Sequence, residues 1–412
     1  MDGIKRASKK TYFLIGFHRK KREKKDMAFL ECFLVALRLG LTSFGGPVAH
    51  LGYFHEAYVE RKKWLSEERY AELLAVCQFL PGPASSQLGA AIGFERGRWA
   101  GAIGAWLGFT LPSAILMILL AVGLGSLSEW LGTGWIHGLK LAAVAVVANA
   151  ILGMRKKLCP DLPRMILAVV IALLLFFIAL AWMQPLMILL GGIVGSVWFY
   201  KSGENKAESI KKPFPLYSTL VLGAFAAGVL ALSLVTFSSK DAQLTAGLFK
   251  SGSLVFGGGH VVLPLLDAET VGNGMMEKDE FLAGYGAAQA VPGPMFSLSA
   301  FLGAHLPIGE NPWAGGFIAL GALFAPGMIL LALGMPIWNA FKDNQRVKAG
   351  LLGANAAVVG LLIAALAHIL KVGTVLTLWD ALFVAVCFAL LASKKVPVWL
   401  IVIAAAGVGV LL

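Results

Sequence analysis

The stretch Gln78–Gln87 reads QFLPGPASSQ and lies inside a long apolar segment of the chain. A second stretch, QAVPGPMFSL at residues 289–298, repeats its glutamine, its Pro-Gly-Pro and its serine at a constant offset (292 − 81 = 211). Pro-Gly-Pro cannot continue a regular helix, because each proline lacks an amide hydrogen and clashes with the preceding turn. Within a bilayer such a break is tolerated only where protein or water satisfies the freed backbone groups. We therefore expect two broken helices that line a polar site.

A half-helix that restarts at each break would offer hydrogen-bond donors to an anion. In the first copy we predict Gly82 as the N-cap and Pro83 as the first helical residue. The backbone N–H groups of Ala84–Ser86 would then point into the break, and those of Met295–Ser297 would do the same in the second copy. A helix N-terminus carries partial positive charge and favours anions.

The composition is that of a membrane protein. Of the 412 residues 58% are hydrophobic and 14% are charged, whereas soluble domains average about 25% charged residues. A soluble globular enzyme is therefore excluded, and we expect an all-α polytopic membrane protein. Because roughly 20 apolar residues span a bilayer, we count about thirteen candidate spans. They lie at residues 28–53, 70–94, 99–124, 135–154, 164–182, 184–200, 216–237, 243–266, 280–305, 313–338, 346–370, 374–392 and 396–412.

The net charge of +12 is concentrated at the start of the chain, where many Lys and Arg residues crowd residues 1–26. We interpret this tail as a cytoplasmic topology signal that can touch anionic lipid headgroups; nucleic-acid binding is a poor alternative beside a membrane body. With the N-terminus inside, most basic connections are cytoplasmic. The connection at residues 56–69 disagrees, because its basic residues would lie outside; a re-entrant first or second segment would change this local assignment.

The repeat extends beyond the Pro-Gly-Pro motifs. Arg38 precedes Phe44 by six residues, and Lys250 precedes Phe256 by the same six. Candidate spans one to four recur as eight to eleven, and an odd number of segments separates the copies. The sequence therefore predicts two inverted repeats, a design of secondary transporters that bind substrate at the repeat interface. We expect a tail at residues 1–27, repeats at 28–200 and 243–412, and a linker at 201–242 with one extra span.

Tandem glycines form a second pair of breaks, FGGP at residues 44–47 and FGGGH at residues 256–260. Glycines in mid-segment weaken a helix and permit close backbone approach. They predict either a second pair of half-helix starts or close packing between helices.

Two cations and a histidine accompany these breaks. Arg38 and Lys250 are intramembrane cations, which are costly in lipid and usually face a cavity or a partner. For Arg38 the alternative is snorkelling to the interface. His260 could titrate or donate to an anion, although a lone histidine beside glycines is more often structural. Gln78 and Gln289 are expected to satisfy freed carbonyls and so orient the breaks.

The predicted substrate-facing residues combine backbone breaks, hydroxyls and cations. We find no Gly-x-x-x-x-Gly-Lys-Ser/Thr nucleotide loop, no cysteine pair with metal-ligand spacing, and no catalytic cluster, so we expect neither a cofactor nor a metal. The candidate set is Arg38, Gly45, Gly46, Pro81, Gly82, Pro83, Ser85, Ser86, Lys250, Gly257, Gly258, His260, Pro292, Gly293, Pro294 and Ser297, with Gln78 and Gln289 in orienting roles.

At these motifs the chain resembles the chromate ion transporter (CHR) family. The resemblance covers about residues 28–412 and rests on two Gly-Gly and two Pro-Gly-Pro signatures in order, together with GAAIG at residues 89–93. It implies a long-chain, two-domain protein with antiparallel halves that exports chromate from the cytoplasm.

The physical argument agrees with an oxyanion, since chromate is a tetrahedral dianion that only accepts hydrogen bonds. We expect a secondary active exporter in the plasma membrane that works by alternating access, driven by membrane potential, ion coupling or both. A departing dianion gains about 4–5 kcal/mol per 100 mV. A transporter of sulfate or another oxyanion, a passive anion channel and a membrane-embedded enzyme remain as alternatives. The expected partners are the oxyanion and the lipid bilayer, and a homodimer is plausible.

Overall fold

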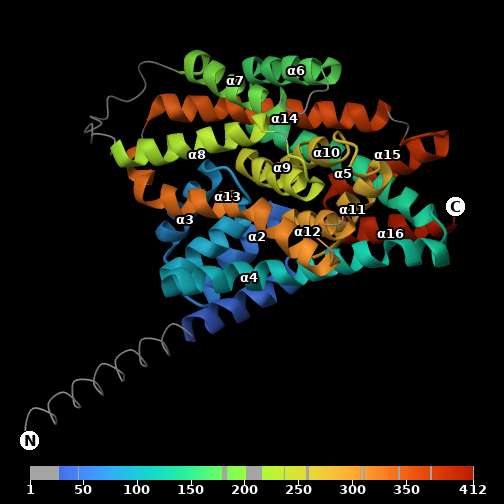
Figure 1. The fold of residues 1–412 in the computed structure, drawn as a ribbon, viewed down its shortest axis with the longest axis horizontal. Coiled ribbons are helices and arrows are strands. Elements are labelled where there is room, and N and C mark those ends of the chain that lie inside the picture. The colour runs from blue at the N-terminus through green and yellow to red at the C-terminus, as the bar shows by residue number, and fades with distance from the viewer. Residues whose placement is uncertain are drawn as a thin grey trace, which may run out of the picture.

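The computed structural model describes residues 27–411 apart from 45, 179–182, 201–215, 236, 257–258, 307, 310, 342–343 and 372–373. The basic tail, part of the predicted linker and three predicted site residues, Gly45, Gly257 and Gly258, therefore lie outside the described residues. Every regular element in the described part is helical (Figure 1). The predicted all-α class is confirmed.

Most of the described helices are joined by short connections. Their bounds are residues 27–42, α2 (Gly46–Phe54), the π-helix η1 (His55–Arg61), α3 (Glu67–Phe79), α4 (Ala84–Leu131), α5 (Gly134–Leu158), α6 (Leu162–Phe177), α7 (Met183–Trp198), α8 (Leu216–Leu234), α9 (Lys240–Leu254), η2 (Gly259–Val261), α10 (Val262–Thr270), α11 (Lys278–Ala290), η3 (Met295–Ser297), α12 (Leu298–His305), α13 (Pro312–Phe341), α14 (Gln345–Lys371), α15 (Leu378–Ser393) and α16 (Val398–Leu411).

Polar side chains fix where several helices begin. Ser66, Asp161 and Ser239 accept hydrogen bonds from first-turn N–H groups of α3, α6 and α9. Thr377 forms a reciprocal capping box with Asp380 at the start of α15. Each cap satisfies an N–H that has no acceptor inside the helix. These side-chain caps mark helices that begin after connections. The half-helices that begin after the Pro-Gly-Pro breaks have no side-chain cap.

Four helices, α4, α5, α13 and α14, are long and apolar enough to cross a membrane, and shorter apolar helices accompany them among the described residues. The chain is therefore a polytopic helical membrane protein. The count of thirteen crossings is not confirmed, because several predicted spans turn back on themselves.

The predicted span 70–94 is a helical hairpin. Gly97 and Arg98 have non-helical backbone angles, which separates residues 84–96 from the long part of α4. Arg69 Nη2, at the start of α3, donates to Glu95 Oε1 at 2.5 Å. A straight helix would hold Arg69 and Glu95 about 39 Å apart at 1.5 Å per residue. The chain thus reverses at Pro-Gly-Pro, and we call residues 67–96 the first hairpin.

The predicted span 280–305 is corrected in the same way. Glu280, at the start of α11, accepts a hydrogen bond from His305 Nε2, at the end of α12, over 3.0 Å. The offsets from the first hairpin are 280 − 69 = 211 and 305 − 95 = 210. Residues 278–305 therefore form a second hairpin, with its own Pro-Gly-Pro at the tip.

The segments with tandem glycines also return to their starting ends. Arg96, at the base of the first hairpin, pairs with Glu31 at 3.1 Å and lies over the Trp64 ring at 5.3 Å. Residues 27–42 therefore begin where η1 ends. In the second half Asp241, at the start of α9, accepts from Gly309 N at 2.8 Å, beside the base of the second hairpin. The predicted spans 28–53 and 243–266 are thus corrected as well.

The two hairpin bases lie at opposite ends of α4. The long part of α4, residues 99–131, is about 50 Å long and starts directly after the first hairpin. Near its other end Lys140 of α5 pairs with Asp279, at the base of the second hairpin, over 2.7 Å. In Figure 1 α3 lies toward the left and α11 toward the right of the horizontal α4. The two hairpins therefore approach each other from opposite ends, tips inward.

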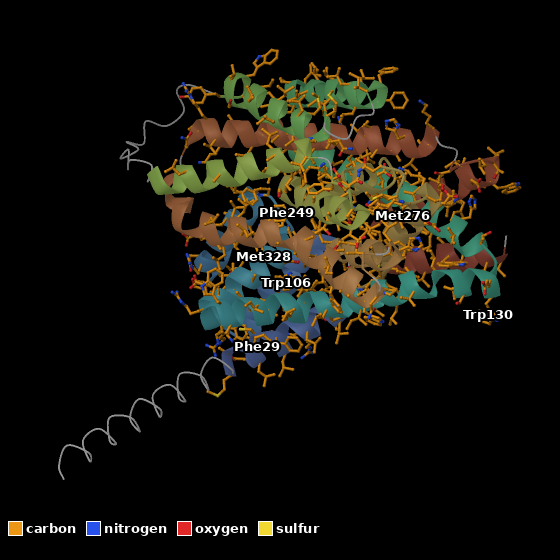
Figure 2. All side chains as sticks on the ribbon, viewed as in Figure 1. Phe29, Trp106, Trp130, Phe249, Met276 and Met328 are labelled. Atoms are coloured by element: carbon orange, nitrogen blue, oxygen red, sulfur yellow. The ribbon has the colours of Figure 1, made fainter. Side chains whose placement is uncertain are left out.

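Close helix packing holds this arrangement together. A Cβ at Gly40 would lie 2.6 Å from Phe109 O of α4, and one at Gly252 of α9 would lie 2.0 Å from Leu323 O of α13. Small residues allow helices in lipid to approach at such distances. In Figure 2 Trp106 and Met328 lie between α4 and α13, whereas Trp130 lies at the far end of α4.

Candidate functional site

The two Pro-Gly-Pro tips each bind the opposite half of the chain. Gly82 N donates to Val255 O at 2.8 Å, and Gly293 N donates to Ser43 O at 3.0 Å. Val255 directly follows α9, and Ser43 directly follows helix 27–42. Each tip therefore docks where the opposite half approaches its tandem glycines, and the exchange is reciprocal.

The tips require glycine at their centres. Gly82 has φ +128° and Gly293 has φ +99°, conformations that side chains disfavour. A Cβ at Gly82 would lie 2.9 Å from Gly327 Cα, and one at Gly293 would lie 3.0 Å from Ser113 Oγ. Gly327 follows Pro326 in α13, and Ser113 follows the only proline in α4, Pro112. Each tip therefore rests on a proline-containing helix of the opposite half, the first tip on α13 and the second tip on α4.

Helices restart at both tips, as the sequence predicts, although one residue later than expected. Pro83 is the N-cap of α4, not Gly82, and Ala84 is its first residue. Pro294 is the N-cap of η3, which leads into α12. Proline has no polar side-chain hydrogen-bonding group with which to cap, so the first-turn N–H groups of α4 keep their donors free for another acceptor. Ser85 and Ser86 lie in that first turn and are buried.

Buried hydroxyls without a protein partner gather on the segments that form the tips. Ser86 Oγ lies on the first half-helix, Ser43 Oγ at the end of helix 27–42, Thr110 Oγ1 on α4 and Ser251 Oγ on α9, and none of these atoms has a hydrogen bond. Buried polar atoms in proteins are nearly always paired. Such a set is suited to a polar ligand or to water. Ser297, the repeat counterpart of Ser86, is likewise buried.

Two residues absent from the predicted set contribute directly to the first tip. His50 of α2 is fully buried, and its Nδ1 lies 3.4 Å from Ser85 Oγ. Its Nε2 has no partner. Gln87 Nε2 donates to Pro81 O at 3.0 Å and to Gly327 O at 2.8 Å. Sequence signals existed for both, because His50 follows FGGP in an apolar run and Gln87 closes the first motif.

Gln87 performs the bridging role that was predicted for Gln78. Gln78 is exposed on α3, whereas Gln87 satisfies the Pro81 carbonyl that the break frees. In the second tip Gln289 Nε2 lies 2.5 Å from Met295 Sδ. His260, also in the predicted set, contacts Tyr285 OH of α11 through Nδ1 at 3.0 Å.

The two predicted cations differ in their surroundings. Arg38 is exposed, in line with snorkelling to the interface. Lys250 is partly buried and forms an ion pair with Glu269 of α10; the two side chains are 12% and 8% exposed. Of the pair, only Lys250 lies within the protein body, and it already has a counter-ion.

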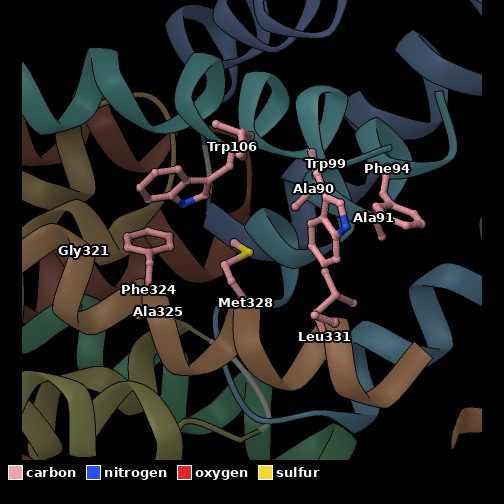
Figure 3. A pocket seen from close by; sticks show the side chains of 13 residues that line it. Ala90, Ala91, Phe94, Trp99, Trp106, Gly321, Phe324, Ala325, Met328 and Leu331 are labelled. Carbon is pink, nitrogen blue, oxygen red and sulfur yellow. The ribbon is translucent and has the colours of Figure 1, made fainter. Parts of the chain in front are cut away.

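One apolar pocket is separate from these polar groups. It is a groove of about 380 Å³ between α4 and α13, and Figure 3 shows Trp106, Phe324 and Met328 on its walls. Its lining is apolar, so it cannot compensate the cost of removing a dianion from water. The candidate anion site is therefore the meeting point of the tips.

Metal chemistry receives no support within the described residues. No group of three or more His, Cys, Asp or Glu side chains there could hold a metal ion. The four cysteines, all described, are buried and free.

These features define a class of protein: a polytopic helical membrane protein with two broken-helix hairpins around buried polar groups. Comparison with known proteins makes the assignment specific. The profile of the chromate transporter family matches residues 30–196 and 242–410. The chain belongs to the chromate transporter family, as the motifs predicted, and proteins of this family are transporters and not enzymes.

Full-length relatives agree with this assignment. The chain is 28% identical to a chromate transport protein of Pseudomonas aeruginosa over 82% of this chain and 80% of the relative. It is 29% identical to a chromate transport protein of Cupriavidus metallidurans over 90% of both chains. It is also 27% identical to an uncharacterised transporter of Methanocaldococcus jannaschii over 96% of this chain and 97% of the relative. No solved structure matches significantly.

Proposed function

We propose that this chain is a secondary active transporter that exports chromate across the plasma membrane by alternating access. The observation that carries the proposal is the reciprocal docking of two Pro-Gly-Pro tips beside buried, unpaired hydroxyls. Membership of the chromate transporter family and two relatives named as chromate transport proteins supply the substrate.

The chemistry of the site suits a tetrahedral dianion. Such an anion only accepts hydrogen bonds, and the first turn of α4 offers backbone N–H groups with the positive end of a helix dipole. The unpaired hydroxyl of Ser86 adds a donor at the same tip, and the hydrogen-bonded pair of Ser85 and His50 adds one more, because one proton is used between Ser85 Oγ and His50 Nδ1. Ser297 occupies the corresponding place at the second tip.

The architecture we propose is a pair of inverted repeats at residues 28–200 and 243–412, joined by a linker at 201–242. Reciprocal contacts are what two-fold related units make, and the bonds of Gly82 and Gly293 have this form. Hairpin bases at opposite ends of α4 support the inversion. Repeats of this kind can rock against each other around a central site. A homodimer stays a prediction.

The hairpins support a cytoplasmic N-terminus. Because the first two segments return, residues 56–69 lie at the same end as residue 31, together with Arg61, Lys62 and Lys63. Their basic charge then agrees with the positive-inside rule. The opposite end holds the acidic stretch at residues 267–280.

The electrical energetics of a dianion support export as the direction of transport. With the cell interior negative, a dianion that leaves gains about 4–5 kcal/mol per 100 mV. The helix dipoles of two opposed tips would bind it near the membrane midplane, where it would otherwise be costly to place a charge.

The test compares two serines in inside-out vesicles with radiolabelled chromate and an imposed potential. Ser86→Ala removes an unpaired hydroxyl at the tip and should lower uptake. Ser299→Ala is the matched control, because Ser299 Oγ already donates to Phe296 O at 2.9 Å; uptake per folded protein should be kept. Full uptake by Ser86→Ala would contradict the site. Equal block by sulfate would identify a general dianion carrier, and no chromate flux in the unmodified protein would reject the function.

A further inference from the structure

We propose that Glu269 is a substrate mimic. Its carboxylate pairs with Lys250 when the site is empty, an incoming dianion displaces it, and the released carboxylate takes up a proton from the surrounding solution. This inference rests on the proposed function and assigns it a coupling residue. The substrate would then bind together with about one proton.

The ion pair is built into the packing of α9 on α10. A Cβ at Gly247, one turn before Lys250, would lie 2.6 Å from Glu269 Oε2. Only glycine leaves room there for the carboxylate. The pair is therefore a specific fit between the two helices and not a chance surface contact, since Lys250 and Glu269 are 12% and 8% exposed.

Lys250 lies close to the meeting point of the tips. Lys250 precedes Val255, whose carbonyl accepts the hydrogen bond of Gly82, by five residues, or about 7.5 Å at the helical rise per residue. Ser251 Oγ, the neighbouring hydroxyl, is buried and unpaired. An anion at the tips would thus find an ammonium group and a free donor on the same helix.

The charge balance favours displacement of the Glu269 carboxylate by the dianion over binding of the dianion beside an ionised Glu269. A buried ammonium without a counter-ion is strongly unfavourable, so Lys250 needs an anion both before and after substrate binds. The empty pair is neutral. A dianion beside Lys250 and an ionised Glu269 would leave two uncompensated negative charges, whereas protonation of Glu269 leaves one. Intramembrane carboxylates commonly serve as proton sites in transporters.

Few other titratable groups face this pair. From α10 itself Asp267 pairs with Lys278 of α11 at 2.6 Å. On α9 the remaining acid is Asp241, which accepts from Gly309 N. Between Lys348 and His368, α14 has no titratable side chain. The short helix η2 contributes His260, which contacts Tyr285. Glu269 is thus the carboxylate placed to exchange with substrate.

The experiment measures chromate binding to the purified full-length protein from about pH 6 to about pH 8.5, with Glu269→Gln beside the unmodified protein. Chromate's own protonation affects both proteins equally, so the ratio of their affinities isolates Glu269. We expect Glu269→Gln to bind at least roughly fivefold more tightly at the alkaline end. The ratio should fall toward one with falling pH, by up to about tenfold per pH unit. Glu277→Gln, an exposed acid without a capping bond, should match the unmodified protein.

A constant ratio near one would overturn the inference while leaving the transporter assignment intact; no chromate binding by the unmodified protein would overturn the proposed function itself. Should Glu269→Gln fold poorly, Glu269→Asp retains the acid and should keep the pH dependence. Proton uptake on chromate addition, followed with a pH indicator, gives a second measurement: it should be lost in Glu269→Gln, and its persistence there would contradict the mechanism.

Discussion

Gly82→Ala should separate the geometry of the first tip from general helix packing. The change adds one methyl group at a residue whose φ is +128°. The new Cβ would lie 2.9 Å from Gly327 Cα and 2.8 Å from Gln87 Nε2. The side-chain amide can move, but the backbone atom of α13 cannot do so without shifting the helix. We expect the tip to be displaced and its bond to Val255 O to lengthen.

The size of the effect follows from two contributions. A non-glycine residue in such a backbone conformation costs roughly 1–3 kcal/mol. Overpacking against a backbone atom adds roughly 1–3 kcal/mol. The total is about 2–6 kcal/mol. Gly132, between α4 and α5, has φ +74°, and a Cβ added there would have no atom within 4 Å, so Gly132→Ala carries the first contribution alone.

The assay has two readouts. Thermal unfolding in detergent, followed by the fluorescence of the 11 tryptophans, reports stability. Chromate uptake per folded protein reports the site. We expect Gly82→Ala to unfold at a lower temperature than Gly132→Ala and to lose much more uptake. Gly293→Ala should be intermediate in stability, because its first obstacle is the Ser113 hydroxyl.

Equal stability and uptake in Gly82→Ala and Gly132→Ala would refute the argument. It would mean that the tip can accept a side chain against α13, and that the reciprocal docking of the tips does not constrain transport.

Two further predictions concern the base of the first hairpin. Arg69→Glu should remove the ion pair with Glu95 and lower the stability by about 0–1 kcal/mol, since both side chains are over 30% exposed. Adding Glu95→Arg restores opposite charges and should recover part of the loss in unfolding temperature. A double variant less stable than either single variant would count against the hairpin base. The hydrogen bond and charge of Glu67 raise the pKa of His55 above 6.5, so protonated His55 stabilises the fold at low pH and this stability is lost as pH rises through the raised pKa. Between about pH 6 and about pH 8.5 the unfolding temperature should therefore fall less with pH in His55→Gln than in the unmodified protein. Identical pH dependence of the unfolding temperature in the two proteins would disprove the link.

The sequence predicted the positions of the breaks well because the responsible effects are local. Proline lacks an N–H wherever it stands, and the helix restarts within one residue of the predicted place, at Ala84. The two helices on which the tips rest also each contain a proline beside the contact, Pro112 in α4 and Pro326 in α13. Burial and partner choice are not local. Whether Gln78 or Gln87 would satisfy the Pro81 carbonyl depends on how the two half-helices fold together.

The difference between local effects and tertiary contacts also explains why the surroundings of Arg38 and Lys250 could not be predicted. Arg38 and Lys250 occupy equal positions relative to the tandem glycines, yet Arg38 is exposed and Lys250 is partly buried beside Glu269. The sequence distance of 19 residues between Lys250 and Glu269 is uninformative until residues 243–266 are known to turn back. Once α10 runs back along α9, the lysine and the glutamate meet.

The reversal of the chain at each break could not be predicted from the pattern of apolar residues. A Pro-Gly-Pro is compatible with a helix that continues across the membrane and with one that reverses, because both free the same backbone groups. The information lies in charge: the four basic residues at 61–69 violate the positive-inside rule if residues 28–53 cross, and satisfy it if they return. The contacts of Arg96 with Glu31 and Trp64 require the second case. A charge conflict next to a helix break is therefore a signal for a re-entrant hairpin in chains of this kind.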